Sequence, residues 1–230
     1  MCYTIPKDNL FYKMLNLLYQ NPAEFLVVSF LLLIAISIHE FSHALAADYL
    51  GDPTPRLAGR LTLNPFAHLD PIGTLLLLFA GFGWGKPVPF DPFNLRNIKR
   101  DSSLISFAGP FSNLILAIVA SLILRTISNF SLFLLSSFFV DILSTFIYFN
   151  VLLAVFNLIP IHPLDGFKVV AGILPQKYYH DWLSLERYGI LFLFLLIFPI
   201  LGSPPIFSII SPIVNFILSF LIPTRMGGII

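Results

Sequence analysis

The residues with the clearest capacity for chemistry are His39, Glu40 and His43, which form a His-Glu-x-x-His pattern. They lie in an apolar stretch from Phe25 to Leu50 that predicts a helix. Residues four apart share one face of a helix, so His39 and His43 can present two imidazole nitrogens to one metal ion. Glu40 borders that face, where a carboxylate can take a proton from a water that the metal activates.

The same three residues allow a structural interpretation, in which two buried histidines only hydrogen-bond to neighbouring helices. A charge near the middle of a bilayer is costly and is rare without a function. Three costly groups at this spacing in one apolar helix therefore favour the metal site.

The composition is that of a membrane protein. The 230 residues are 57% hydrophobic and 11% charged, whereas soluble domains carry about 25% charged residues. We therefore expect the lipid bilayer to surround the chain. The net charge of +1 gives no reason to expect a nucleic-acid partner. Cys2 is the only cysteine, so a metal site must use histidine and carboxylate ligands.

Four apolar regions are long enough to cross a membrane of about 30 Å. They are Phe25–Leu50, Leu104–Ile127, Phe130–Ile161 and Tyr188–Ile222. The sequence Gly-Ser-Pro-Pro at 202–205 divides the last region into two helices. The sequence thus predicts an all-α polytopic membrane protein with about five to six transmembrane helices. A polar, amphipathic segment over residues 1–22 precedes them.

The apolar stretch Pro71–Phe82 is too short for a full crossing. Glycines surround it, and the segment Gly83–Phe90 is typical of extended chain with turns. Non-helical backbone at membrane depth is tolerated only where protein or water satisfies it. We therefore expect a re-entrant segment or hairpin near residues 71–90, lining a wet cavity.

Basic residues distinguish the two sides of the membrane if Pro71–Phe82 does not cross. Ten then lie on one side and three on the other, where Lys7, Lys13 and Arg125 are found. The positive-inside rule places the ten in the cytosol. We expect a multi-pass protein of the cell membrane, with the amino terminus outside and the His39–His43 turn nearer the cytosolic face. If Pro71–Phe82 does cross, this bias weakens.

Two histidines do not complete a catalytic zinc site, which normally has three protein ligands and an open position. The other candidates are His68, His162, His180 and the carboxylates. Asp165 lies in an Asn-Leu-Ile-Pro-Ile-His-Pro-Leu-Asp-Gly stretch over 157–166 that ends an apolar helix. Alone, this stretch is typical of a helix end with a solvated aspartate. Together with the His-Glu-x-x-His pattern, it favours Asp165 as an oxygen ligand.

The two motifs together resemble the site-2 protease family of intramembrane metalloproteases. The motifs between them resemble the short members of that family: Gly59-Arg-Leu-Thr-Leu-Asn64-Pro-x-x-His68-x-Asp70-Pro, Gly83-Trp-Gly-Lys-Pro-Val-Pro and Ala108-Gly-Pro-x-x-Asn113. The resemblance covers about residues 30–170. It implies the branch without a PDZ insertion or a CBS tail.

This resemblance implies one integral-membrane metalloprotease domain over residues 1–230, which acts on transmembrane protein substrates. It implies that His39, His43 and Asp165 bind Zn²⁺, that Glu40 is the general base and that Asn157 binds substrate. His162 stands where many members have proline, so a supporting contact or an alternative ligand role remains open for it.

The expected function is an intramembrane zinc metalloendopeptidase that hydrolyses peptide bonds in or near transmembrane segments. One alternative is a membrane metal-ion transporter, although such proteins usually carry ionisable residues along a path and often show repeated halves. Another is a non-proteolytic family member that binds membrane segments. The sequence does not fix the substrate or the oligomeric state.

We expect structural roles for three polar residues that are not among the proposed metal ligands. Asn113 is expected to bond to backbone groups across helices, and Asn150 to face the interior of the bundle. His68 is expected to stabilise a turn, with a supporting contact to the site as the alternative.

Overall fold

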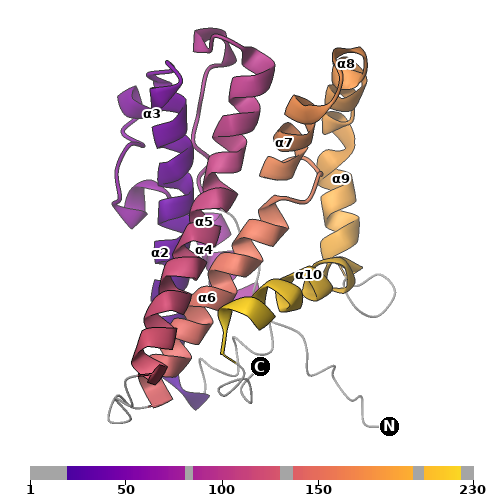
Figure 1. The fold of residues 1–230 in the computed structure, drawn as a ribbon. Helices are drawn as coiled ribbons and strands as arrows, with labels where there is room; N and C mark the ends of the chain where they lie inside the picture. Colours follow the sequence, from indigo (N-terminus) through magenta and orange to yellow (C-terminus); the bar gives the residue numbers. More distant parts are fainter. Residues whose placement is uncertain (1–19, 81–84, 130–136, 199–204, 224–230) are drawn as a thin grey trace.

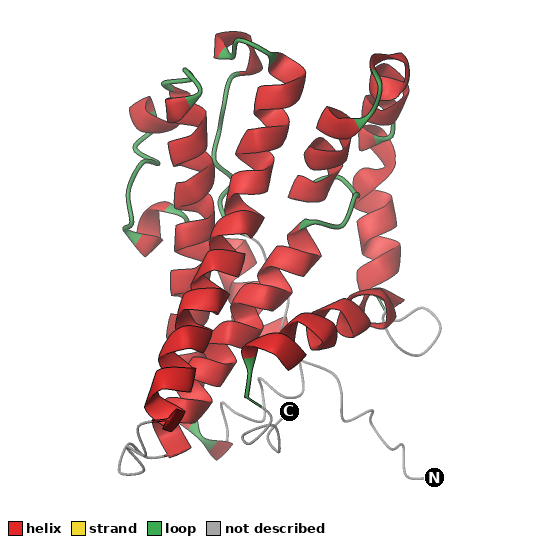
Figure 2. Cartoon of the chain, viewed as in Figure 1, coloured by secondary structure: helices red, strands yellow, loops and turns green. Residues whose placement is uncertain are grey.

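The structure is a computed structural model that describes residues 20–80, 85–129, 137–198 and 205–223 (Figure 1). Helices joined by loops account for these residues (Figure 2). Within the described ranges, the only strand-like pairing is an isolated bridge between Leu69 and Gly85. The predicted all-α class is confirmed. Most of the amino-terminal segment 1–22 lies outside the described residues.

Three long helices form the main bundle: α2 (Pro22–Tyr49), α5 (Ile98–Asn129) and α6 (Ser137–Asn157). Each contains an apolar stretch long enough to cross a membrane, of 28, 30 and 19 residues. Large apolar side chains such as Phe30, Phe111 and Leu122 are exposed on the outside of these helices. An apolar outer surface is stable against lipid rather than water, so the chain is a membrane protein.

The described part of the segment between α2 and α5 contains four short helices: α3 (Thr54–Leu57), η1 (Pro65–Ala67), α4 (Pro71–Ala80) and η2 (Pro92–Asn94). Before α4, the backbone at His68 and Leu69 pairs with Gly85 and Lys86 after it, and the Lys86 amide donates to the His68 carbonyl at 2.8 Å. We call residues 68–69 and 85–86 the neck of this segment.

The neck shows that the segment it closes returns to the level where it starts. The ten residues of α4 rise about 15 Å, half of a hydrocarbon core of about 30 Å. This arrangement agrees with the predicted re-entrant hairpin. Residues 81–84, which include Trp84, lie outside the described part.

Residues 158–198 and 205–223, the described part after α6, form four further helices: α7 (Asp165–Ile173), α8 (Gln176–Ser184), α9 (Glu186–Ile197) and α10 (Pro205–Leu221). The region Tyr188–Ile222, where two crossings were predicted, therefore contains helices of 12 and 17 residues. The Gly-Ser-Pro-Pro break falls mostly on residues 199–204, outside the described ranges. Figure 1 shows α10 lying steeply across the lower part of α6 rather than along it.

One face of α10 packs into the core. Its buried residues recur every fourth position, at Ile206, Ile210, Val214 and Leu218, which is the spacing of one helix face. They join Leu124 and other apolar residues of α5 and α6 in a single cluster. At the end of α10, the Ser121 hydroxyl of α5 donates to the Leu221 carbonyl at 2.5 Å.

Candidate metal centre

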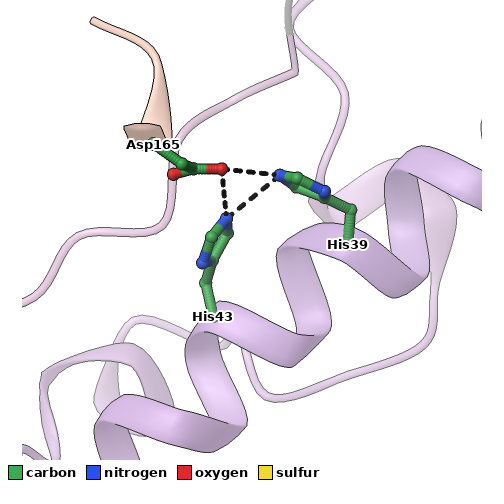
Figure 3. Close-up of side chains that lie close together, drawn as sticks. All are labelled: His39, His43 and Asp165. Atoms are coloured by element: carbon green, nitrogen blue, oxygen red, sulfur yellow. Dashed lines mark hydrogen bonds and ion pairs between the residues drawn. The ribbon is translucent and has the colours of Figure 1, made fainter. Parts of the chain in front are cut away.

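Three side chains from two distant parts of the chain converge on one point (Figure 3). His39 and His43 lie one turn apart on α2, and Asp165 is the first residue of α7. The two Nε2 atoms are 3.1 Å apart. Asp165 Oδ2 lies 3.1 Å from Nε2 of His39 and 3.2 Å from Nε2 of His43. Among the described residues, this is the one histidine–carboxylate group arranged to hold a metal ion.

This triangle fits a zinc ion in both chemistry and size. Ligand atoms at about 2.0–2.1 Å from a tetrahedral zinc stand about 3.3–3.4 Å from one another, close to the separations of 3.1–3.2 Å seen here. Imidazole nitrogen and carboxylate oxygen are both zinc donors. Three protein ligands leave the fourth position open, as in catalytic rather than structural zinc sites. His39, His43 and Asp165 can therefore bind Zn²⁺.

The far side of each imidazole ring fixes its orientation. His39 Nδ1 donates to Asn113 Oδ1 at 2.6 Å, and His43 Nδ1 donates to the Ile105 carbonyl at 2.7 Å. A carbonyl oxygen can only accept, so each Nδ1 carries the proton and each Nε2 presents a lone pair to the centre. Such partners orient metal-binding histidines and raise their basicity.

Gly109 makes room for the two rings where α5 crosses α2. A Cβ atom at this position would lie 2.4 Å from His43 Nε2 and 2.7 Å from His39 Cε1. Real Cβ atoms are essentially never found within 3.0 Å of another heavy atom. The glycine therefore allows α5 to press directly against the metal-facing edges of the imidazoles.

The loop between α6 and α7 places Asp165. Two turns shape it, because the Ile161 amide donates to the Ile159 carbonyl and the Leu164 amide to the Ile161 carbonyl, both at 2.8 Å. A Cβ on Gly166 would lie 2.2 Å from the Leu158 carbonyl oxygen. Close backbone packing therefore requires glycine at position 166, next to Asp165.

Glu40 lies on the same helix, beside the neck of the re-entrant segment. A Cβ on Gly85 would be 3.4 Å from Glu40 Oε1 and 3.2 Å from the His68 carbonyl. Within the described ranges, no hydrogen bond is made to the Glu40 carboxylate. It is therefore available to a substrate or a water molecule.

Arg60 holds the neck together. Its guanidinium is buried and donates to the carbonyls of Ala67, at 2.6 Å, and Lys86, one on each side of the neck. Burial lowers the pKa of Arg60, and the negative charge of Glu40 acts against that shift.

His162 is not part of the metal group. Its Nδ1 lies 3.5 Å from Glu186 Oε1 of α9, and its ring packs edge-on against Phe167. The alternative of a ligand role for His162 is therefore not supported by the geometry. His68 is fully buried, and its Nε2 donates to the Thr62 carbonyl at 2.7 Å, which agrees with the predicted turn-stabilising role.

Asn157 lies in the last turn of α6 and is also outside the metal group. Its Nδ2 donates to the Leu153 carbonyl at 3.0 Å, and the side chain is partly exposed. A substrate contact by Asn157 stays a prediction.

Asn113 has a contact with the site that the sequence did not reveal. As predicted, it bonds to backbone across helices, because its Nδ2 donates to the Ala35 carbonyl at 3.2 Å. Its bond to His39, however, ties it to the metal centre. The signal was the Ala-Gly-Pro-x-x-Asn motif at 108–113, which contains both Gly109 and Asn113.

The known proteins that are similar to this chain are all named putative zinc metalloproteases. The chain is 38% identical over 176 residues to the Bacillus subtilis protein named "Putative zinc metalloprotease YwhC", and the match covers 75% of this chain and 80% of that protein. It is 28% identical over 169 residues to "Putative zinc metalloprotease Rip2" of Mycolicibacterium smegmatis, over 72% of this chain and 64% of Rip2.

The Rip2 protein of Mycobacterium tuberculosis is 29% identical over 170 residues. The chain thus spans less than two thirds of the length of these Rip2 proteins, 64% and 63%. No protein-family model matches the chain. No solved structure matches it either.

Proposed function

The chain belongs to the zinc metalloprotease family of YwhC and Rip2, and we propose that it is an intramembrane endopeptidase of the site-2 protease type, in the short branch. Its substrates are membrane proteins, cleaved within or next to a transmembrane segment. The observation that carries the proposal is the convergence of His39 and His43 with Asp165, which is 126 residues beyond His39. Two of these residues lie on a helix long enough to span a bilayer.

His39, His43 and Asp165 are the ligands in this proposal. Zinc, when bound there, would lower the pKa of a bound water molecule toward 7 and would polarise the peptide carbonyl. The protein contributes fixed ligand positions, because Asn113 and the Ile105 carbonyl hold the two imidazole rings.

Glu40 is the proposed general base. It takes a proton from the attacking water and returns it to the leaving amine, a role that typically contributes 10²–10⁴-fold to the rate. Its carboxylate lies on the same helix as the histidine ligands, one residue from His39 and three from His43. The neck of the re-entrant segment is adjacent, so a substrate held there is close to the base.

A helical substrate must unwind before hydrolysis, because its scissile bond is enclosed by its own hydrogen bonds. The extended chain after the neck offers backbone groups for pairing with an unwound substrate strand, as in β-strand addition. Asn157 is the proposed side-chain contact to the same substrate.

The membrane orientation follows from the position of the charges. His43 and His39 lie six and ten residues before the end of α2, which is about 9 and 15 Å along the helix. Arg56, Arg60 and Lys86 belong to the segment that follows that end. By the positive-inside rule we place this end in the cytosol of a multi-pass cell-membrane protein, with the metal centre nearer that side.

The deciding experiment uses purified protein in proteoliposomes with a single-span substrate. We expect the wild-type protein to contain about one zinc per chain and to cleave the substrate. The Glu40→Gln variant should retain zinc and lose about 10²-fold or more in rate, whereas Asp165→Ala should lose zinc. Cleavage by Glu40→Gln at the wild-type rate would contradict the base assignment. Zinc flux without cleavage would favour the transporter.

A further inference from the structure

We propose that Asn150 of α6 is a positioning residue that sets the tautomer of His39 by fixing the orientation of Asn113. The inference rests on the proposed metal site, because a fixed tautomer matters only if His39 Nε2 is a ligand. It uses three hydrogen bonds in series, from the Phe146 carbonyl through Asn150 and Asn113 to His39, and a fourth between Asn113 and the Ala35 carbonyl.

The series begins at Asn150. Its Nδ2 donates to the Phe146 carbonyl, four residues earlier on α6, at 2.9 Å. A carbonyl cannot donate, so the amide nitrogen of Asn150 must face Phe146. The Asn150 Oδ1 is consequently left to face α5.

The next member is Asn113. Its Nδ2 donates to Asn150 Oδ1 at 2.9 Å and to the Ala35 carbonyl at 3.2 Å. Both partners are acceptors, so they take both amide protons. Asn113 Oδ1 must therefore point to His39, and it can offer only an acceptor there.

His39 completes the series. Its Nδ1 lies 2.6 Å from Asn113 Oδ1 and must carry the ring proton. A neutral imidazole has one proton, so Nε2 is left bare and faces His43 and Asp165. Asn150, together with the Ala35 carbonyl, thus orients Asn113 and so decides which nitrogen of His39 can bind metal.

Burial keeps the Asn113 and Asn150 amides in these orientations. Asn113 and Asn150 have no exposed surface, and His39 is 5% exposed. Water is therefore poorly placed to satisfy a flipped amide. If Asn113 turned over, its nitrogen would face His39 and its oxygen would face two other oxygens. Buried polar groups left in this state are costly, so one orientation of both amides dominates.

A purely structural role is the competing explanation, because paired asparagines also hold membrane helices together. In that case Asn150→Leu would lower stability and leave the His39 tautomer unchanged. The two explanations differ in a measurement that reports the ring protons directly.

The first measurement is nitrogen NMR of histidine-labelled, metal-free protein in detergent. We expect His39 to carry its proton on Nδ1 in the wild type, and on Nε2 in a substantial fraction of Asn150→Leu molecules. Ser121→Ala is the matched control, since it removes a buried hydrogen bond between α5 and α10 away from the metal centre. It should leave the tautomer unchanged.

The second measurement is zinc affinity by chelator competition. Asn113→Leu should weaken binding about 10–100-fold, as for other partners of ligand histidines. Asn150→Leu should weaken it about 3–10-fold, the typical value of one neutral hydrogen bond. Because Asn150 acts through Asn113, the double variant should bind zinc as Asn113→Leu does. Asn150→Asp, in its protonated form, keeps a donor for the Phe146 carbonyl and an acceptor for Asn113, so it should retain near-wild-type affinity.

The outcomes separate this inference from the proposed function. A wild-type protein that binds no zinc would refute the metal site itself. Normal zinc binding by the wild type, with an unchanged tautomer and affinity in folded Asn150→Leu, would refute only the role of Asn150. Losses that add in the double variant would also refute it, because they would show that Asn150 acts independently of Asn113.

Discussion

Replacing Gly109 with alanine should remove zinc from the protein while leaving most of the fold in place. The added Cβ would lie 2.4 Å from His43 Nε2 and 2.6 Å from His43 Cε1. The shortest real Cβ contacts are near 3.0 Å, and ordinary ones begin near 3.4 Å. To reach these distances the His43 ring must move by about 0.6–1 Å. Functional sites tolerate a displacement of only about 0.5 Å from their productive geometry.

The expected size of the effect follows from that displacement. Inserting one methyl group into a packed interior typically costs about 1–3 kcal/mol, which a folded protein can survive. The zinc affinity should fall further than the 10–100-fold loss seen when only a partner of a ligand is removed, because a ligand atom is itself displaced. Zinc content after dialysis and chelator competition measure this loss.

A matched control comes from Gly172 of α7, where an added Cβ would lie 2.3 Å from Ser103 Cβ. This clash is of the same severity, but it falls in the last turn of α7, at the opposite end from Asp165. Gly172→Ala should lose thermal stability and keep zinc. Wild-type zinc affinity in a folded Gly109→Ala variant would refute the view that α5 contacts the metal-facing edges of the imidazoles.

Three further predictions concern the neck, the loop after α2 and the metal itself. Arg60→Lys keeps the charge but loses the forked donor pair. It should make the neck, residues 68–69 and 85–86, more susceptible to proteolysis and lower the cleavage rate about 10-fold, as expected for a disturbed supporting contact. Burial would raise the pKa of Asp52, but hydrogen bonds from Thr54, Asn94 and the Asp91 amide outweigh it and lower the pKa. Asp52 should therefore stabilise the fold above its unfolded pKa of about 3.9, and the contribution should vanish as pH falls through the lower folded value; thermal unfolding of Asp52→Asn should depend less steeply on pH in this range. Removing zinc with a chelator should lower the unfolding temperature of the wild type, since a ligand that binds only the folded state at 100 times its Kd contributes about 2.7 kcal/mol, and it should leave Asp165→Ala unchanged.

The sequence predicted the parts of the metal centre that depend on local periodicity. His39 and His43 follow from helical spacing alone, whereas the role of Glu40 as general base stays a prediction. Asp165 needed the second motif, because nothing local shows that residues 126 apart meet.

The contacts of Gly109 and Asn113 could not be predicted, since they depend on where α5 crosses α2. The motif marked both residues as unusual, but only the packed helices show that one makes room for the imidazoles and the other orients His39. Asn150 was expected to face the bundle interior, and it does; its partner there is a property of the α5–α6 contact.

The carboxyl-terminal helices show what hydropathy cannot predict about an apolar region. The composition of Tyr188–Ile222 indicates an apolar region, but composition gives neither helix length nor direction. α9 has 12 residues, and α10 lies across α6 with one face in the core. An apolar run indicates burial in lipid or protein without distinguishing between them.

The closed neck has a consequence for the membrane topology of the chain. A re-entrant segment enters and leaves the membrane on the same side. It therefore does not change the direction in which any later helix crosses the membrane. His39 lies ten residues before the end of α2 at Tyr49, and Gly109 lies eleven residues after the start of α5 at Ile98. At these similar distances along two antiparallel helices, Gly109 meets the imidazole ring of His39. Lengthening the segment beyond the neck would leave that alignment intact, whereas adding or removing a single residue between Ile98 and Gly109 would rotate α5 by about 100° and turn the glycine away from the imidazoles.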